Sequence, residues 1–311
     1  MDSTIRKAVD FGLNRIPTLD ITDIGLGPWS VSTLKTLEKC PLKFFLDKIA
    51  KAKPEIIMTE DSAVTQIGRA AHYWVEQIVL GRNVKEGLEL TEAEHKAEVT
   101  DAYWHRVTDL YGSMYSFEER MRTFKENNKI ALIQPELKIG LDVNFNKIGF
   151  FDKNVFFRGV IDLPILLEAG DVVIIDHKYG PDPAWGTKHY QKQFNAYKVL
   201  YHKGVRPVRG IQTGIHFMRC VDLVMDKYTP SSQVPMLQHS LSMDIKDAVA
   251  RVADEGAFNY SRTTLCNYCD FRDMCKGGKR GTAGELQFIV DESKPLLKQA
   301  LARGKTSDNP F

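Results

Sequence analysis

The sequence lacks any long apolar run. No stretch of its 311 residues approaches the roughly 20 consecutive apolar residues that a transmembrane helix needs. Residues 1–17 also lack the apolar segment of a secretory signal peptide. These absences predict a cytoplasmic protein, or one of the host cytoplasm if the source is a virus, with no membrane partner.

The chain also has almost no net charge. Its 42 basic and 40 acidic residues leave +2 at pH 7, so a globally basic surface for nucleic acid is excluded and any DNA contact must come from local patches. A Walker-type phosphate loop is missing as well, because Gln299 stands where the triplet Gly304-Lys305-Thr306 would require a glycine. An ATP-driven motor is therefore not encoded.

What is present is apolar content sufficient for folding. Hydrophobic residues make up 43% of the chain and charged residues 26%. At this length, that composition predicts one large globular domain, or a domain with a sub-domain, around a sizeable core.

The stretch from Arg158 to Tyr197 combines core strands with charge. The apolar runs Val155–Leu167 and Val172–Ile175 are bounded by glycine and aspartate, which predicts two buried strands joined by a tight turn at residues 169–171. Acidic and basic side chains interrupt or close these strands at Asp162, Asp176 and Lys178. Because side chains alternate along a strand, Asp176 and Lys178 should share one face while His177 points to the other.

Two interpretations of these charges stand side by side. A buried carboxylate costs several kcal/mol unless something compensates it. A divalent metal held between Asp162 and Asp176 would do so, with Lys178 orienting a water or stabilising charge on a phosphate. The alternative is an Asp162–Lys178 salt bridge at the end of a hairpin.

Two helices carry further candidates. On a helix expected over residues 62–80, His72 and Glu76 are four residues apart and share a face, one turn after Gly68, which would permit a close approach of backbone or ligand. A plain hydrogen bond between His72 and Glu76 is the alternative. On a second helix, expected over residues 187–202, Gln193 and Tyr197 again share a face.

Cysteine is scarce, with five residues in all, and three of them form a cluster. Cys266, Cys269 and Cys275 have the spacing CxxC-x5-C, which in a reducing compartment indicates a metal or cluster site. Cys40 is the better fourth ligand, and Pro41 after it predicts a break in the helix expected over residues 30–50. Cys220 is expected to be inert. Spacing alone leaves zinc and iron–sulfur open, although one distant and three clustered cysteines favour iron–sulfur.

Taken in order, these features resemble the RecB-like branch of the PD-(D/E)XK nuclease superfamily. The resemblance spans residues 30–276. Within this branch, the sequence is most similar to the iron–sulfur exonucleases typified by the CRISPR-associated RecB-like exonuclease and the AddB nuclease domain. It departs from the common pattern at two positions: Ile161 replaces proline before Asp162, and Tyr179 follows Lys178 where a small residue is common.

The resemblance implies a role for each candidate. His72, Asp162 and Asp176 match the ligands of Mg²⁺ or Mn²⁺, with His177 a further ligand through its backbone carbonyl, and Asp162, Asp176 and Lys178 form the catalytic set. Gln193 and Tyr197 match a helix that contacts DNA or orients the lysine. The ligands of a [4Fe-4S] cluster are matched by four cysteines: Cys40, Cys266, Cys269 and Cys275.

The fold implied is α/β, a restriction-endonuclease-like core with a mixed central sheet flanked by helices, a helical insert, and an iron–sulfur clasp joining the N- and C-terminal parts. The expected divisions are a lead-in (1–29), a helix with Cys40 (30–61), a helical region with His72 (62–133), the nuclease core (134–258), the cluster segment (259–280) and a tail (281–311).

The activity implied is metal-dependent exonucleolytic cleavage of DNA, with preference for single-stranded ends and 5′-to-3′ polarity. Trp185 and Tyr197 are candidate stacking platforms for bases. Expected partners are DNA and proteins of recombination, repair, replication or CRISPR adaptation. The alternatives are a non-cleaving DNA-end-binding subunit of such a complex, and a zinc-stabilised endonuclease.

Overall fold

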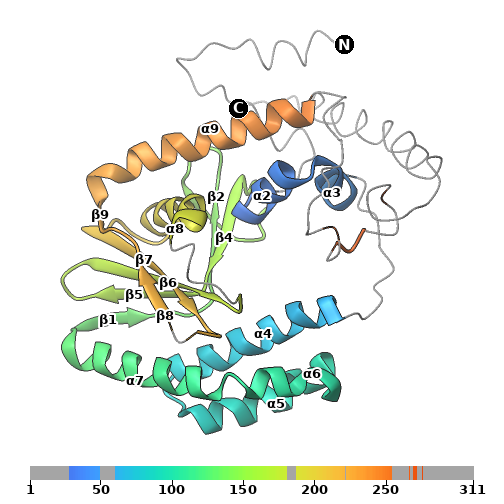
Figure 1. Cartoon of the computed structure of the whole chain (residues 1–311). Helices are drawn as coiled ribbons and strands as arrows, with labels where there is room; N and C mark the ends of the chain where they lie inside the picture. The colour runs from blue at the N-terminus through green and yellow to red at the C-terminus, as the bar shows by residue number, and fades with distance from the viewer. Residues whose placement is uncertain are drawn as a thin grey trace. The chain divides into compact units, whose positions relative to one another are not determined.

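The computed structural model describes residues 28–49, 60–180, 187–220, 222–253, 266, 269–271 and 275 (Figure 1). The chain divides into two compact units, each discontinuous in sequence. Unit 1 comprises residues 1–56, 140–159 and 239–311, and unit 2 comprises residues 57–139 and 160–238. The predictions for Trp185, for the tail and for most of the lead-in fall outside the described residues.

Unit 2 is built on a six-stranded mixed sheet. Strands follow the order β1-β5-β6-β7-β8, and β9 pairs with β7. β6 and β7 run parallel and the other pairs are antiparallel, which confirms the predicted mixed sheet. The strands are β1 (Ile130–Ile133), β5 (Leu163–Leu167), β6 (Asp171–Lys178), β7 (Gly210–Phe217), β8 (Asp222–Met225) and β9 (Thr229–Pro230).

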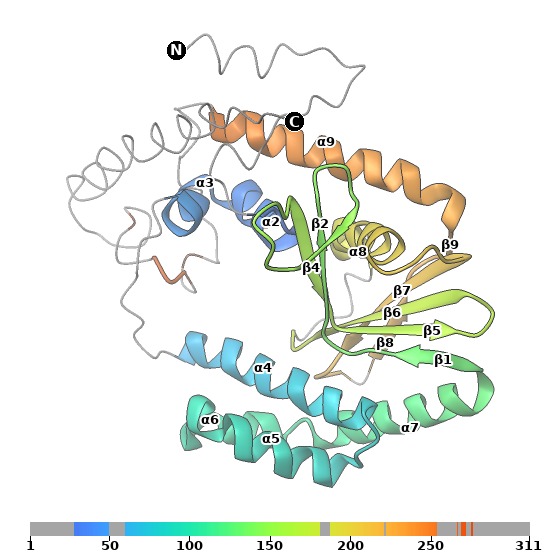
Figure 2. The same cartoon turned by 180° about the vertical axis from the view of Figure 1, so that it is seen from behind.

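Helices cover both faces of this sheet, as predicted (Figure 2). Phe194 of α8 packs with Ile215 and Phe217 of β7 on one face. On the other face, apolar residues of α4 and α7 pack against β5 and β6. The helices of this unit are α4 (Glu60–Val79), α5 (Val84–Val99), α6 (Asp101–Thr108), α7 (Tyr111–Asn127) and α8 (Gln191–Gly204).

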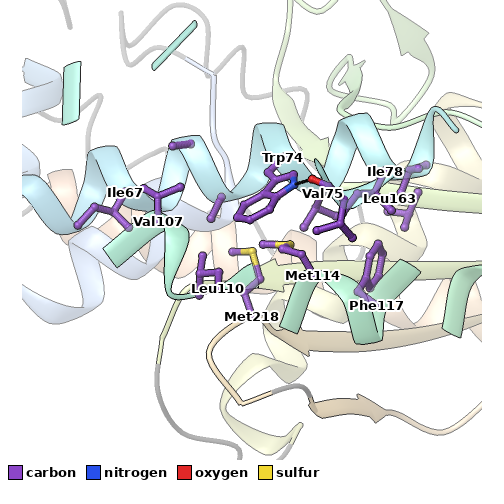
Figure 3. Packing of buried hydrophobic residues seen from close by; sticks show 14 of the residues in the cluster. Ile67, Trp74, Val75, Ile78, Val107, Leu110, Met114, Phe117, Leu163 and Met218 are labelled. Carbon is purple, nitrogen blue, oxygen red and sulfur yellow. Dashed lines mark hydrogen bonds between the residues drawn. The ribbon is translucent and has the colours of Figure 1, made fainter. Parts of the chain in front are cut away.

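The core under α4 is closely packed. Figure 3 shows Trp74 and Ile78 of α4 facing Met114 and Phe117 of α7. The Trp74 side chain is fully buried, and its indole N–H donates a 2.9 Å hydrogen bond to the carbonyl of Val84. Burial of so large a ring, with its polar atom satisfied, fixes the position of α4 in this unit.

Unit 1 contains a short helical segment and a hairpin. Ser30 caps α2 (Val31–Lys39), and the chain then breaks at Cys40 and resumes as α3 (Pro41–Phe44) and a π-helical stretch (Phe45–Ile49). The expected break before Pro41 is present. Trp29 bridges to Phe157 and stacks on Phe44 with ring centroids 5.8 Å apart.

Three strands form a smaller sheet in the order β3-β2-β4. They are β2 (Leu137–Leu141), β3 (Lys147–Ile148) and β4 (Phe157–Ile161), and the long helix α9 (Val234–Ala253) follows β9. In the described part of the chain, no helix is long and apolar enough to cross a membrane.

The expected strand Val155–Leu167 is wrong in one respect. The structure divides it into β4 and β5, which belong to different sheets, and Asp162 lies at the break. Its carboxylate accepts the backbone N–H of His177, which a residue in the middle of a continuous strand would not do. The break thus turns an anomalous core residue into the centre of a polar cluster.

Candidate active site

Asp162 occupies the junction where β4 ends and β5 begins. Its Oδ2 accepts the N–H of His177 at 2.8 Å, and its carbonyl accepts the N–H of Glu136 at 2.8 Å. The side chain is 13% exposed. The side chain of Asp162 is therefore tied to β6 and its backbone to the turn that holds Glu136, which fixes the position of the carboxylate.

Asp176 and Lys178 project from the end of β6 on the face that α8 covers. Lys178 Nζ lies 2.6 Å from Asp176 Oδ2, and it also lies 5.9 Å above the ring of Tyr190. Asp176 is 1% exposed, whereas Lys178 is 29% exposed. Lys178 thus pairs with Asp176 rather than Asp162, and its ammonium group still reaches solvent.

Gln193 and Tyr197 of α8 hold the other oxygen of Asp176. Gln193 Nε2 donates to Asp176 Oδ1 at 2.8 Å, and the Tyr197 hydroxyl donates to the same atom at 3.0 Å. Both side chains are buried, so Tyr197 has no face open to a nucleobase and cannot stack one, contrary to expectation. In this structure the two residues orient a carboxylate.

His72 and Glu136 complete a group of possible metal ligands. His72 Nδ1 lies 3.6 Å from Asp162 Oδ2 and 3.9 Å from Glu136 Oε1, and the three ligand atoms fall within 4.8 Å of one another. Imidazole and carboxylate donors at this spacing suit a divalent cation. Within the described part of the chain, His72 contacts Glu136 and Asp162 and forms no hydrogen bond with Glu76.

Sequence reasoning missed Glu136. It sits in the turn between β1 and β2 with a left-handed backbone, φ 52°, that places its carboxylate beside His72. No periodicity or motif marks the position, since turn residues are often acidic and solvated. Only the pairing of its N–H with Asp162 brings it to the site.

His177 points to the opposite face, as strand alternation predicts. Its imidazole is buried, with Nδ1 lying 3.1 Å from His216 Nδ1, and the ring of Phe117 stacks on His216 at 4.5 Å. Burial lowers the pKa of His177, and burial likewise lowers the pKa of His216 to about 3. Both imidazoles are therefore uncharged at neutral pH and contact each other through their Nδ1 atoms. The predicted role of the His177 carbonyl stays a prediction.

No backbone of the described residues approaches Gly68 closely, and the predicted approach of a ligand stays a prediction. A Cβ added there would lie 3.8 Å from Tyr179 Cβ, an ordinary contact, so alanine would fit. Burial raises the pKa of Glu76, and the charge of Glu136 raises it further, which shows that Glu76 lies near Glu136.

The buried charges shift one another strongly. Burial and the neighbouring Asp176 raise the pKa of Asp162 to about 7. Burial lowers the pKa of His72, but Glu136 and Asp162 raise it by more. Burial likewise acts against the charged form of Lys178, and Asp176 and Asp162 overcome it, so that its pKa is raised. Such mutual shifts are typical of functional sites.

Unit 1 gathers cysteines in a second place. Cys40, Cys269 and Cys275 pack on an apolar cluster formed by Leu42, Phe45, Leu46 and Phe271. The N–H of Cys269 lies 3.4 Å from the carbonyl of Cys266, and none of these four described cysteines is in a disulfide. Burial raises the pKa of Cys269, with Cys40 among the contributing charges. Cys220 packs in the core beside α8 instead.

A histidine–carboxylate group that could hold a divalent metal thus lies beside a lysine at the end of a mixed sheet flanked by helices, an arrangement that suits a metal-dependent nuclease. In agreement, the family model described as the PD-(D/E)XK nuclease superfamily matches residues 28–276. The match covers most of the chain, which therefore belongs to this superfamily, whose members are metal-dependent nucleases that act on DNA. No curated protein matches the chain at a significant level.

The raised pKa of Asp162 predicts how the metal-free protein responds to pH. A folded pKa of about 7, above an unfolded value of about 4, means that Asp162 favours folding when protonated. That contribution is complete below about pH 4 and is lost as the pH rises through 7. Asp162→Asn should therefore melt several degrees above wild type at pH 8 in a chelator, with the gap closing toward pH 5.

Asp171→Asn is the matched control, because Arg209 lowers the pKa of Asp171 below its ordinary range. Its effect on melting should be constant between pH 5 and 8. Adding Mn²⁺ should raise the melting temperature of wild type but not of Asp162→Asn. If the difference in melting temperature between Asp162→Asn and wild type does not vary with pH, the raised pKa of Asp162 is contradicted.

The bond from Tyr197 predicts a role in metal affinity. Tyr197→Phe removes one donor from Asp176 Oδ1 and leaves the ring in place. Loss of such an orienting bond weakens metal binding on the order of tenfold. Calorimetric titration with Mn²⁺ measures this, and Tyr201→Phe, one turn along the same buried helix, should bind as wild type does. Equal affinities for both variants would refute the role.

Proposed function

We propose that this protein is a metal-dependent DNA exonuclease that acts on single-stranded ends. The observation that carries the proposal is the group in unit 2 in which Lys178 lies 2.6 Å from Asp176, next to His72, Glu136 and Asp162. These residues come from one helix, one turn and two strand ends, so a ligand set of this kind does not arise from local sequence alone.

The donors fit Mg²⁺ or Mn²⁺. Three carboxylates and one imidazole supply the oxygen and nitrogen atoms these ions take, and buried carboxylates this close need a cation to stay ionised. When bound, the ion would polarise the scissile phosphate and lower the pKa of an attacking water. His72, Asp162 and Asp176 are the proposed ligands, with the backbone carbonyl of His177 and the carboxylate of Glu136 as additional ones.

Lys178 is the proposed catalytic residue. Its ammonium group is held by Asp176 and is partly open to solvent, so it can meet a phosphate from outside. In that place it would hold the attacking water and offset negative charge on the phosphate oxygens. Gln193 and Tyr197 keep Asp176 turned toward both the metal and the lysine.

A [4Fe-4S] cluster is proposed for unit 1. The thiols that would hold it are those of Cys40, Cys266, Cys269 and Cys275. What supports this is that Cys40 packs on the same apolar residues as Cys269 and Cys275, more than two hundred residues along the chain. Closing so long a loop would strongly constrain the unfolded chain, so the cluster's role is structural.

Exonuclease action and 5′-to-3′ polarity are proposed because the sequence resembles RecB-like iron–sulfur exonucleases. Roles in recombination, repair, replication or CRISPR adaptation follow from the same resemblance. A non-cleaving DNA-end-binding subunit is the competing function. It is disfavoured because an inactive site has no reason to keep two adjacent carboxylates buried at such cost.

Cleavage of end-labelled DNA tests the activity. Protein purified without oxygen is incubated with linear and with circular single-stranded DNA in Mg²⁺ or Mn²⁺. Shortening of the linear strand alone is expected, and the label released first gives the polarity. Lys178→Ala should lower the rate by two to three orders of magnitude. Lys203→Ala, an exposed lysine in the last turn of α8, should cleave normally.

Cutting of the circular strand would show an endonuclease instead. Binding without cleavage in either metal would replace the proposal with the accessory-subunit function.

Iron content tests the cluster separately. Wild type should be brown, with iron and labile sulfide, whereas a zinc protein is colourless because zinc is d¹⁰. Cys269→Ala should lose iron and become poorly soluble, while Cys220→Ala should keep both colour and stability. Zinc in place of iron, or a soluble and fully active Cys269→Ala protein, would exclude the cluster.

A further inference from the structure

An exposed aromatic side chain lies in the loop that joins β3 to β4, two strands that do not pair with each other. Phe151 is 80% exposed, more than any other large hydrophobic residue described. A phenylalanine so exposed loses the benefit of burial, and single exposed apolar residues usually need no explanation. Phe151 differs from these because the structure around it is firmly ordered and carries a second aromatic ring and a cation.

Backbone hydrogen bonds fix the turn that carries Phe151. The N–H of Asp152 donates to the carbonyl of Gly149 at 3.0 Å, and the N–H of Val155 donates to the carbonyl of Asp152 at 3.2 Å. The Asp152 carboxylate also accepts the N–H of Asn154 at 2.9 Å. The ring is thus presented by a turn that is already organised, which lowers the entropy lost when something binds to it.

Phe150 and Arg158 support the exposed ring. The rings of Phe150 and Phe151 meet edge to face with centroids 4.9 Å apart. The Arg158 guanidinium lies 4.9 Å from the centroid of Phe150, and its Nη1 donates to the Phe150 carbonyl at 3.4 Å. Arg158 thus contacts Phe150, and Phe150 contacts Phe151, whose ring is otherwise exposed to solvent.

The charge around the turn favours an anionic partner. Lys147 and Lys153 are exposed, and Arg158 is half-buried under Phe150. Two carboxylates lie in the same segment, and both are engaged by the turns: Asp142 accepts backbone N–H groups of Asn144 and Asn146, and Asp152 accepts that of Asn154. Three basic residues thus lie in this segment beside two carboxylates that are hydrogen-bonded within their own turns.

We propose that Phe150 and Phe151 of the loop between β3 and β4, with Arg158 of β4, form a stacking platform for an unpaired base of single-stranded DNA. The proposal rests on the proposed function for its substrate. An aromatic face accepts any base, nearby cations bind the backbone, and a paired base inside a duplex has no free face to offer. It also supplies what Tyr197 cannot, because that ring is buried at the metal site.

A protein partner fits this surface less well. A stable interface buries about 800 Å² on each side around a central apolar cluster. Phe151 contacts Phe150, which is partly covered and has the Arg158 guanidinium over its ring. An exposed ring with a cation close by suits one flat aromatic ligand and an attached phosphate.

Binding in the absence of cleavage tests the platform. The Lys178→Ala protein in a chelator is titrated into labelled oligothymidylate and into a blunt duplex of the same length, and fluorescence anisotropy gives the two dissociation constants. Phe151→Ala should weaken single-strand binding on the order of tenfold and leave duplex binding nearly unchanged. Phe151→Trp should bind at least as tightly as the parent protein.

Leu80→Ala is the matched control, since Leu80 is an exposed apolar residue of unit 2, with 59% of its surface exposed. It should leave both constants unchanged. A base analogue, 2-aminopurine, gives a direct readout: its fluorescence should be quenched by the parent protein and by Phe151→Trp but not by Phe151→Ala.

Equal single-strand affinity of Phe151→Ala and its parent would overturn the platform while leaving the nuclease intact, if the wild type still cleaves. If Phe151→Ala instead changes the molecular mass in solution and leaves DNA affinity unchanged, Phe151 contacts a second copy of the protein. That result would also overturn the platform. Failure of the wild type to bind any DNA would remove the proposed function itself.

Discussion

Two carboxylates held close together in the interior govern this structure. Asp162 and Asp176 are both largely buried, and the proximity of Asp176 helps raise the pKa of Asp162 to about 7. Such a pair opposes folding unless cations compensate it. The chain meets this requirement with Lys178 on one side and His72 on the other, and a bound divalent ion would complete it. The polar contacts of the site follow from this requirement.

Much of the site could be predicted because its residues stand out from their strands. Charged residues at the ends of apolar runs mark Asp176 and Lys178, and a period of two places them on one face, as the structure has it. The mixed sheet flanked by helices was an expectation that the resemblance to the PD-(D/E)XK superfamily implied, and the structure confirms it. Similarly, Pro41 marked the break at Cys40.

The remainder depends on contacts between distant residues, which no local pattern encodes. Glu136 enters the site because its backbone pairs with Asp162, and the apolar run from Val155 divides between two sheets because Asp162 needs a junction. Helical spacing likewise predicts that Gln193 and Tyr197 share a face, but it does not predict which residue they contact. The structure shows that both donate hydrogen bonds to Asp176. The division of the chain into two units, each made of segments that are distant in sequence, also depends on tertiary contacts.

The arrangement separates two tasks within the chain. Unit 2 holds the charged residues that would bind metal and phosphate, and unit 1 holds Cys40, Cys266, Cys269 and Cys275 and the loop with Phe150 and Phe151. The superfamily to which the chain belongs uses divalent metals, and the buried carboxylates explain why a protein of this construction requires them.

The central claim is that His72, Asp162 and Asp176, with Glu136 beside them, hold a catalytic divalent ion. Anomalous diffraction from crystals soaked in Mn²⁺ tests it most directly. The account predicts a strong manganese peak bonded to His72 and Asp162, within reach of Asp176, and no such peak in crystals of Asp162→Asn. A peak elsewhere in the chain, or none here in protein that cleaves DNA with Mn²⁺, would contradict it.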